Sequence, residues 1–329
     1  MKAKTFLEIT KWDDAQCREY LEQMRWPDGP RCPKCGSLEH WTINRKKPGK
    51  NQVTKLYRCK GCRKQYTVTV GTIFEDSHIP LNKWLIAIHL MCSSKKGISA
   101  LQLARELNME HSYRHAWFMA HRIREAMKDK SFPKLTGTVE ADETYIYPKR
   151  QRGHPVQKEL VKDEQEMGLR PTIKKDWREG KTTVFGILER GGSVRTMVVP
   201  KATAKELRPL LEGYIDTDNS KLMTDGHPAY RLIKHKMPHG IIDHEVTYTD
   251  GDIHTQGIEN YWSLLKRGLV GTFHHVDQEY LPEYLSEFEF RFNRRKVSDA
   301  ERFASLMGQT QGRVTWFCRK PQPSENPHA

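Results

Sequence analysis

The chain has 329 residues, of which 37% are hydrophobic and 29% charged, with a formal net charge of +14 at pH 7. This composition predicts a folded multidomain protein and excludes disordered, collagen-like and disulfide-scaffold classes. The longest uncharged apolar run, Leu85–Cys92, is shorter than the roughly 20 residues of a membrane span, and the N-terminus carries no apolar secretory block. We therefore expect no membrane partner.

Basic charge is concentrated in the N-terminal part of the chain. Residues 1–130 hold 25 basic and 13 acidic side chains, whereas residues 131–329 hold 30 and 28. Within residues 31–70 there are 11 basic residues and one acidic residue. Such a field attracts polyanions, of which the nucleic-acid backbone is the commonest. On composition alone, a basic surface that only contacts solvent and binds no partner is an equally good explanation.

The first two segments are a short helical lead over residues 1–27 and a cysteine-bearing block over residues 28–75. The block contains two C-x2-C pairs, Cys32 with Cys35 and Cys59 with Cys62. Each pair presents two thiolates on one tight turn, and two such pairs complete a tetrahedral zinc site. Redox C-x-x-C motifs are the alternative, but no βαβ pattern surrounds either pair. The sequence therefore predicts a zinc ribbon that holds one structural Zn²⁺.

Residues 79–130 contain apolar residues at helical spacing in three runs, 81–91, 99–107 and 111–127. Ser99 is an expected N-cap, and Leu101, Ala104 and Leu107 form one face of the helix. Two such helices joined by a short turn match a helix-turn-helix module, whose second helix enters the major groove by its first residues. Three short amphipathic helices are also common in proteins where they only support the fold. The interpretation that this module binds DNA therefore depends on the basic ribbon that precedes it in the chain.

Residues 135–303 change in character, because strand-like stretches alternate with helical ones. This alternation predicts an α/β domain with a largely covered sheet. A charged stretch at 148–181 is expected to be a surface insertion, and residues 304–329 are assigned to a C-terminal tail. The expected strands are 138–146, 182–188, 194–199 and 221–224, and the expected helices are 204–214, 258–269 and 280–294.

Three acidic residues of this domain lie where phosphoryl-transfer chemistry needs them. Asp142 is inside a strand, Asp225 follows a strand, and Glu259 is near the start of a helix. Converging carboxylates bind two Mg²⁺ or Mn²⁺ ions, which flank one scissile phosphate. Lys266 follows Glu259 by two helical turns and therefore lies on the same face of the helix, where it is expected to contact the phosphate backbone of DNA. With 41 acidic residues in the chain, a fortuitous triple of surface carboxylates is the alternative.

Strand alternation assigns the neighbouring acids to different faces. Glu140 shares a strand face with Asp142, whereas Glu143 points to the opposite face. Asp216 and Asp218 are the competing acids near Asp225.

Several long segments of the chain, taken in their order along the sequence, resemble those of the zinc-ribbon DDE transposases of bacterial insertion sequences. CPKCGS at 32–37 is similar to their ribbon, VEADETY at 139–145 and TDGHPAY at 224–230 to the segments with the first two catalytic acids, and HTQGIENYWSLLKRG at 254–268 to the third. The resemblance implies a ribonuclease H-like catalytic domain, and it maps the catalytic acids to Asp142, Asp225 and Glu259. It also implies binding to terminal inverted repeats and assembly as a homo-oligomer on DNA. Gln256 departs from the Asn of the family pattern.

The sequence thus predicts an enzyme that cleaves phosphodiester bonds at element ends and then transfers the strands. The expected partner is double-stranded DNA, and the expected location is the cytoplasm, in association with the nucleoid. A DNA-binding regulator that lost its chemistry is the alternative, and a nuclease that never joins strands is a weaker one. Candidate phosphate contacts are Lys34, Arg45, Lys46 and Lys47, with Arg114 as a candidate base reader.

Overall fold

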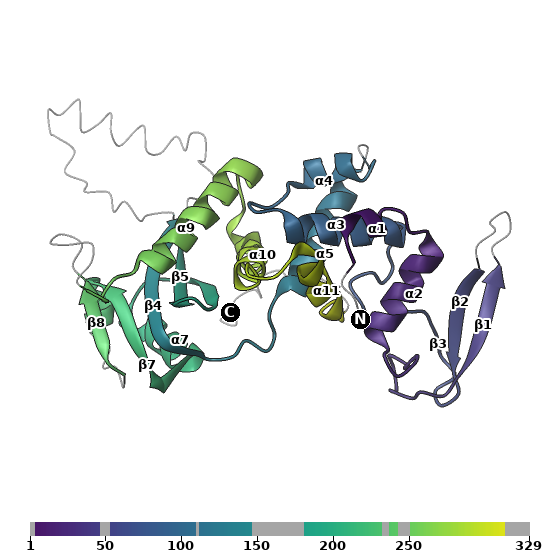
Figure 1. Cartoon of the computed structure of the whole chain (residues 1–329), viewed down its shortest axis with the longest axis horizontal. Helices are drawn as coiled ribbons and strands as arrows, with labels where there is room; N and C mark the ends of the chain where they lie inside the picture. The colour runs from purple at the N-terminus through teal and green to yellow at the C-terminus, as the bar shows by residue number, and fades with distance from the viewer. Residues whose placement is uncertain are drawn as a thin grey trace, which may run out of the picture. The chain divides into compact units, whose positions relative to one another are not determined.

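The computed structural model describes residues 4–46, 53–109, 112–146, 181–231, 237–242 and 251–312. The chain forms two compact units, one from residues 1–130 together with 286–329 and the other from residues 131–285. Each unit has a hydrophobic core of its own, and Figure 1 labels the elements of both. Residue 111, Lys47 and nearly all of the expected insertion lie outside the described residues.

The first unit is built mainly from helices, and a short polar side chain caps the beginning of α1 (Phe6–Ile9), α2 (Asp14–Arg25), α4 (Ala100–Glu106) and α11 (Asp299–Gly308). Asp13 accepts a hydrogen bond from the Gln16 backbone N–H at 2.8 Å, and Ser99 accepts one from Gln102 at 3.1 Å, as expected of that N-cap. The unit also contains α3 (Leu81–Ser93) and α5 (Tyr113–Met127).

The buried face of α4 coincides only in part with the face that Leu101, Ala104 and Leu107 form. Leu103, Ala104 and Leu107 are buried, whereas Leu101 is 47% exposed. Positions three apart drift around a helix of 3.6 residues per turn, and the packing of α4 against α5 selects the 103–104–107 side. Asn108 has a φ of +51° in the turn that follows, which is a conformation that Asn tolerates better than most residues.

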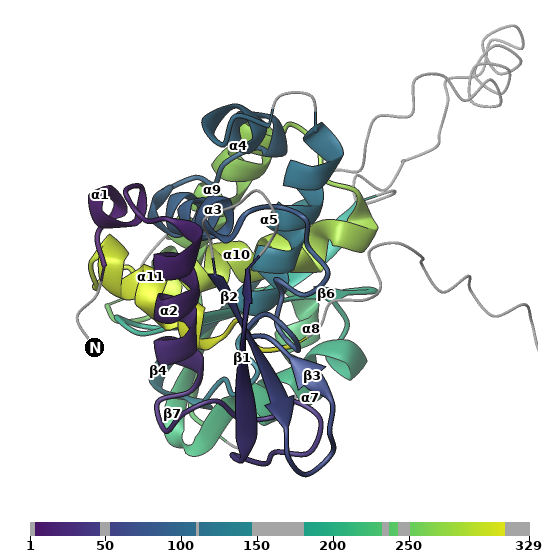
Figure 2. The same ribbon diagram turned by 90° about the vertical axis from the view of Figure 1, so that its right-hand side faces the viewer.

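A three-stranded antiparallel sheet follows α2 in the chain (Figure 2). Its strands are β1 (His40–Lys46), β2 (Val53–Cys59) and β3 (Gln65–Tyr66), in the order β1-β2-β3. One face of the sheet is covered by aromatic contacts, because Trp26 meets both Tyr57 and Tyr66 edge-on at centroid distances of 5.7 and 5.9 Å. The ribbon therefore shares its core with the helices of the first unit.

The second unit is a five-stranded mixed sheet in the order β6-β5-β4-β7-β8. β5 pairs antiparallel with β4 and β6, whereas β7 pairs parallel with β4 and β8. β5 is buried along its length except at its last residue, which is typical of a strand covered on both faces. The strands are β4 (Leu135–Ile146), β5 (Thr182–Glu189), β6 (Val194–Val199), β7 (Ile215–Asp225) and β8 (His239–Ile242).

Helices cover both faces of this sheet. Phe185 and Ile187 of β5 join the core made with α7 (Ala204–Tyr214) and α8 (Pro228–Arg231), while the intervening Gly186 faces α9 (Gln256–Gly268). Figure 1 shows α9 lying across β4 and β5. A π-helical turn (Leu269–Phe273), a 3-10 turn (Gln278–Tyr280) and α10 (Leu281–Asn293) follow.

The residues that follow 303 begin as part of a packed helix and not as a tail. Leu306 and Met307 lie in α11 and are buried in the core of the first unit, although the sequence assigns residues from 304 onward to a tail. In the ranges that the structure describes, no helix combines the length and the apolar character that a bilayer span requires.

Candidate active site and cysteine cluster

The four cysteines of the two C-x2-C pairs come together at one end of the ribbon sheet. Cys59 is the last residue of β2, and the other three lie in turns. Each pair is followed by a residue with a left-handed backbone, Gly36 with φ +76° after the first pair and Arg63 with φ +57° after the second. The two turns are therefore built alike, and each turn brings its two sulfur atoms to the same side.

The sulfur positions fit a tetrahedral zinc ion. The Sγ atoms of Cys32 and Cys62 are 3.6 Å apart, and those of Cys35 and Cys59 are 3.5 Å apart. Zn–S bonds of about 2.3 Å give a tetrahedron whose edges are about 3.8 Å. The backbone N–H of Cys62 donates to the Cys59 sulfur at 3.5 Å, and it is the first of several hydrogen bonds that lower the pKa of Cys59 to about 6. The pKa of Cys35 is raised to about 11, although the hydrogen bond from the Ser37 backbone lowers it, because its sulfur shares a proton with that of Cys59. Cys59 is therefore the thiol that most readily becomes the thiolate that a metal needs.

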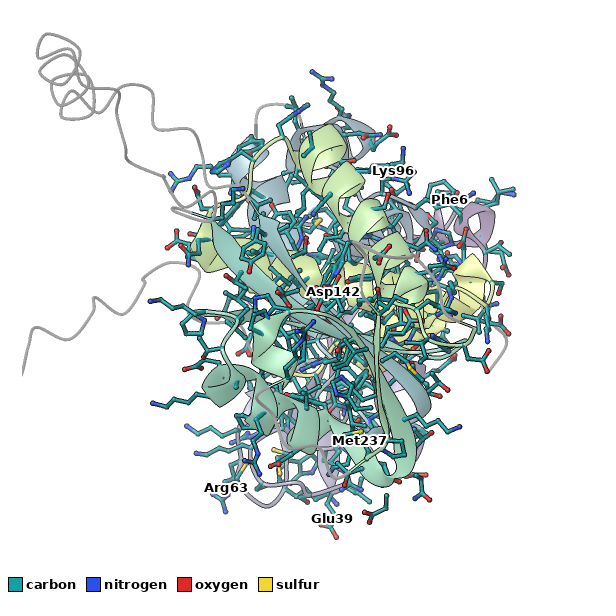
Figure 3. All side chains as sticks on the ribbon, turned by 90° about the vertical axis from the view of Figure 1, so that its left-hand side faces the viewer. Phe6, Glu39, Arg63, Lys96, Asp142 and Met237 are labelled. Carbon is teal, nitrogen blue, oxygen red and sulfur yellow. The ribbon has the colours of Figure 1, made fainter. Side chains whose placement is uncertain are left out.

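Sheet register places Asp142 and Asp225 side by side. In the parallel pairing of β4 with β7, Ala141 is the partner of Thr224, so the two aspartates follow at the same level of neighbouring strands. Residues at the carboxyl ends of parallel strands meet at one edge of a sheet, where α/β proteins commonly bind their ligands. Figure 3 labels Asp142.

The carboxylate of Glu143 lies close to this pair, although the residue points to the other face of its strand. It leaves β4 on the face of α8, as alternation predicts, and accepts a hydrogen bond from the Tyr230 hydroxyl at 2.8 Å. Nevertheless carboxylate oxygens of Asp142, Glu143 and Asp225 all lie within 4.8 Å of one another. Glu143 is therefore an additional candidate ligand, although it leaves β4 on the strand face that alternation predicts.

The electrostatics of this carboxylate cluster favour a bound cation. Desolvation, followed by the charges of Glu143 and Asp225, raises the pKa of Asp142 to about 8. Hydrogen bonds from the Glu143 backbone N–H at 2.8 Å and the Trp262 indole N–H at 3.0 Å oppose this shift only in part. Three carboxylates in one place provide the hard oxygen ligands of a divalent metal ion, whose charge relieves their mutual repulsion.

α9 is attached to the sheet through its first turn. The buried carboxylate of Glu140 accepts the Ile258 backbone N–H at 2.9 Å, and Arg190 donates to the same carboxylate at 2.7 Å. Arg190 also donates to the backbone carbonyls of Asp252 at 2.8 Å and His254 at 2.9 Å. An anion at a helix N-terminus is favourable, so Glu140 fixes where α9 begins.

α9 carries the remaining candidates, Glu259 and Lys266, on its exposed surface. Glu259 accepts a hydrogen bond from the Thr255 hydroxyl at 2.8 Å. Among the residues that the structure describes, it does not join the group of carboxylates that lie within 4.8 Å of one another. Its role as the third catalytic acid therefore stays a prediction, as does the role of Lys266.

Two parts of the chain match known domains. Residues 12–65 match the transposase zinc-ribbon domain, and residues 134–293 match the ISXO2-like transposase domain. The chain belongs to the ISXO2-like transposase family. This confirms the resemblance seen in the sequence, together with an N-terminal four-cysteine zinc ribbon followed by a mixed α/β domain.

Two relatives of this transposase-family chain extend the match. An uncharacterized protein in transposable element ISH50 of Halobacterium salinarum is 28% identical over 301 residues, which cover 88% of this chain and 93% of that protein. An uncharacterized transposase-like protein of Haemophilus influenzae is 30% identical over 105 residues, which cover 32% of this chain and 84% of that protein.

The predicted DNA contacts of this family member fall into two groups. Lys34 in the first cysteine turn and Arg114 in the first turn of α5 are exposed. Arg45 and Lys46 belong to β1, and Lys47 lies outside the described residues. Contact with DNA stays a prediction for all of them.

Proposed function

We propose that this chain is a DNA transposase that binds the terminal inverted repeats of its insertion sequence, cleaves phosphodiester bonds at the element ends and catalyses strand transfer. The observation that supports this most is the carboxylate cluster, in which Asp142 and Asp225 lie at the same level of neighbouring parallel strands under the helix that carries Glu259. The sheet order, with three antiparallel strands followed by two parallel ones, agrees with a ribonuclease H-like domain.

The residues of the site have distinct roles in this proposal. Asp142, Asp225 and Glu259 would hold two Mg²⁺ or Mn²⁺ ions, with Glu143 as an additional oxygen ligand. Two such ions activate the attacking oxygen and stabilise the leaving one in an in-line displacement. The Thr255 hydroxyl orients the Glu259 carboxylate. Lys266, exposed two turns along the same helix, contacts the phosphate backbone of the bound strand.

DNA binding is proposed for the first unit. α4, the turn at Asn108 and α5 form a helix-turn-helix module, in which Arg114 reads bases while Lys34 and the β1–β2 segment contact phosphates. In this proposal the chain is divided into four functional parts, which are a helical lead (1–27), a zinc ribbon (28–75), a helix-turn-helix module (79–130) and a catalytic region (135–303). Assembly of a homo-oligomer on two DNA ends, in the nucleoid, belongs to it as well.

One assay separates the transposase from a regulator that only binds DNA. The full chain is incubated with a labelled element end and Mg²⁺, and nicked and joined products are resolved on a denaturing gel. Asp225→Asn should abolish both products while binding to the end stays within a few-fold of the parent. Asp218→Asn is the matched control, because Asp218 is exposed on the same strand and takes the same substitution. A parent chain that binds the end but never nicks it would support the regulator instead.

A further inference from the structure

We propose that the outward face of the ribbon sheet, formed by Trp41, Ile43, Leu56 and Arg58, is a stacking surface for unpaired DNA bases. The proposal deepens the DNA binding proposed above, since it assigns one form of DNA to one surface of the first unit. It does not depend on the carboxylate cluster or on any cleavage step.

Strand alternation places these four side chains on one face. In the antiparallel register Trp41 is the partner of Arg58, and Ile43 is the partner of Leu56. The residues between them, such as Tyr57, point to the other face, where Tyr57 is 3% exposed and stacks on Tyr66 at 5.5 Å. The aromatic contacts of the ribbon core therefore occupy one face and leave the Trp41 side outward.

The outward face has an unusual composition for a surface that meets water. Trp41 is 49% exposed, Arg58 is exposed, and Ile43 and Leu56 are half-buried, so the row contains two aliphatic side chains, one indole and one cation. Solvent faces of antiparallel sheets are ordinarily polar. The Arg58 guanidinium lies 6.0 Å from the centroid of the Trp41 ring, at the limit of a cation–π contact. A planar ring with a planar cation beside it suits a flat, anionic ligand.

Charge decides which macromolecule fits this face. A second copy of the chain would also bring its own net charge of +14, and residues 31–70 of each copy contain only one acid to offset 11 basic residues. Two such ribbons repel each other, whereas the phosphate backbone of a nucleic acid is attracted. Aromatic side chains in basic grooves bind single strands because every base offers a π-face.

The form of DNA follows from the geometry of stacking. Within an intact duplex both faces of each base are already covered by its neighbours, so an exposed indole has no partner there. Single strands and overhangs offer a free face on every unpaired base, whereas a blunt duplex offers one only at each of its two terminal base pairs. Single strands and overhangs are the forms that strand cleavage at an element end produces, which connects the surface to the proposed function without requiring the chemistry.

The experiment compares three fluorescent DNAs of the same sequence, a single strand, a blunt duplex and a duplex with a 3′ overhang. Each is titrated with the full-length chain in the absence of divalent ions, and anisotropy reports the affinity. Trp41→Ala should weaken binding to the single strand and the overhang duplex by roughly tenfold, as expected for the loss of one stacked base. Binding to the blunt duplex should change by no more than about twofold, and Trp41→Phe should retain most of the affinity.

Two controls keep the result specific. Leu38→Ala removes another exposed apolar side chain of the same ribbon, 48% exposed, and should leave all three affinities unchanged. Lys60→Ala removes an exposed charge next to β2 and should weaken all three DNAs equally. Zinc content measured for each variant verifies that the ribbon is folded. The stacking surface would be overturned if the Trp41→Ala variant bound all three DNAs as tightly as the parent does, or if its affinity for all three fell equally. Binding of an acidic protein to this face would also overturn it.

Because no cleavage is measured, this result is independent of the proposed activity. A chain that never nicks an element end, yet prefers overhangs through Trp41, would contradict the proposed transposase while supporting the stacking surface. A chain that nicks element ends, but whose affinity for overhangs does not depend on Trp41, would support the transposase and contradict the stacking surface.

Discussion

The indole of Trp262 occupies the space that a side chain at Gly186 would need. A Cβ atom at Gly186 would lie 2.5 Å from the Cη2 atom of Trp262 and 2.6 Å from its Cζ2 atom. Gly186 is also the cross-strand partner of Asp142, whose Oδ2 atom accepts the Trp262 indole N–H at 3.0 Å. The missing side chain on β5 thus allows the benzene edge of the indole to pack against β5 while its N–H holds the carboxylate on β4.

Gly186→Ala should therefore damage the site as well as the fold. The added methyl group must push Trp262 away from β5, and overpacking of this kind costs about 1–3 kcal/mol in the free energy of unfolding. Since the indole N–H would leave Asp142, we expect Mg²⁺-dependent nicking to fall by roughly 10- to 100-fold. Thermal unfolding and the nicking assay measure the two effects.

Gly213→Ala is the matched control for this prediction. A Cβ at Gly213, in α7 of the same unit, meets no atom within 4 Å. Replacing glycine by alanine in a helix raises stability by about 0.5–1 kcal/mol. Activity should be unchanged. If Gly186→Ala proved as stable and as active as Gly213→Ala, the indole would not be fixed by the close contact described here.

The cysteine cluster makes a second prediction. We expect one Zn²⁺ per chain, and Cys59→Ala should lose it together with the fold of the ribbon, since metal binding to so small a module supplies folding free energy on the order of 10 kcal/mol. Because Tyr57 and Trp26 belong to the core of the first unit, its helices should melt at a lower temperature as well. Metal analysis and circular dichroism measure these losses.

Cys17→Ala is the control for the zinc prediction. Cys17 is buried in α2, outside the four-cysteine cluster, so its replacement removes packing without removing a ligand. This variant should keep its zinc and unfold only slightly earlier. Purified, untagged parent protein without zinc would refute the assignment of the cluster.

Spacing alone was sufficient for features determined by local chemistry. The two C-x2-C pairs predict one four-sulfur cluster, because the spacing within each pair brings two sulfur atoms together on one tight turn. The expected strand at 194–199 and helix at 204–214 coincide with β6 and α7, since amphipathic periodicity reports burial directly. Asp142 and Asp225 were predicted together from family motifs, and parallel register explains why they meet.

Features that depend on long-range geometry could not be predicted. Alternation gives the correct strand face for Glu143, but it does not give the distance from its carboxylate to those of Asp142 and Asp225. The bond between Arg190 and Glu140 joins residues 50 positions apart, and no local pattern indicates it. The exposure of Leu101 depends on which side of α4 meets α5. Each of these features depends on contacts between different elements of the fold.

The raised pKa of Asp142 predicts how stability depends on pH. Folding raises this pKa from an ordinary value of 3.8 to about 8, so between these values the folded chain keeps a proton that the unfolded chain has lost. Stability of the metal-free protein must then fall as pH rises through this window. Each pKa unit corresponds to about 1.4 kcal/mol, so the loss amounts to several kcal/mol by pH 8.

Asp142→Asn tests this pH dependence. The amide cannot ionise, so without divalent ions the variant should unfold at a higher temperature than the parent at pH 8 and at nearly the same temperature at pH 4. Addition of Mn²⁺ should raise the melting temperature of the parent and not of the variant, because the parent has the carboxylate that binds it. Parallel melting curves of parent and variant across this pH range would contradict the prediction.

The last prediction concerns the ion pair that holds the first turn of α9. Glu140 is fully buried, and it is bonded to Arg190 at 2.7 Å and to the Ile258 N–H at 2.9 Å. Removing one partner of a buried pair leaves an uncompensated charge and costs about 3–5 kcal/mol. We expect Arg190→Gln to destabilise the second unit by this amount and Glu140→Gln by less, because the side chain of Arg190 is 24% exposed and that of Glu140 is 1% exposed. Both variants should slow nicking, because the position of α9 sets the position of Glu259.

A double-mutant cycle separates this pair from an ordinary surface salt bridge. In the variant with both substitutions no lone charge is buried, so part of the lost stability should return and the two effects should not add. Arg208 and Glu212 of α7, 2.9 Å apart and about half exposed, are the control, and breaking their bond should cost less than about 1 kcal/mol. Additive losses in the Glu140–Arg190 cycle would show that the two residues act separately, and α9 would then have to be positioned by Trp262 and its apolar neighbours alone.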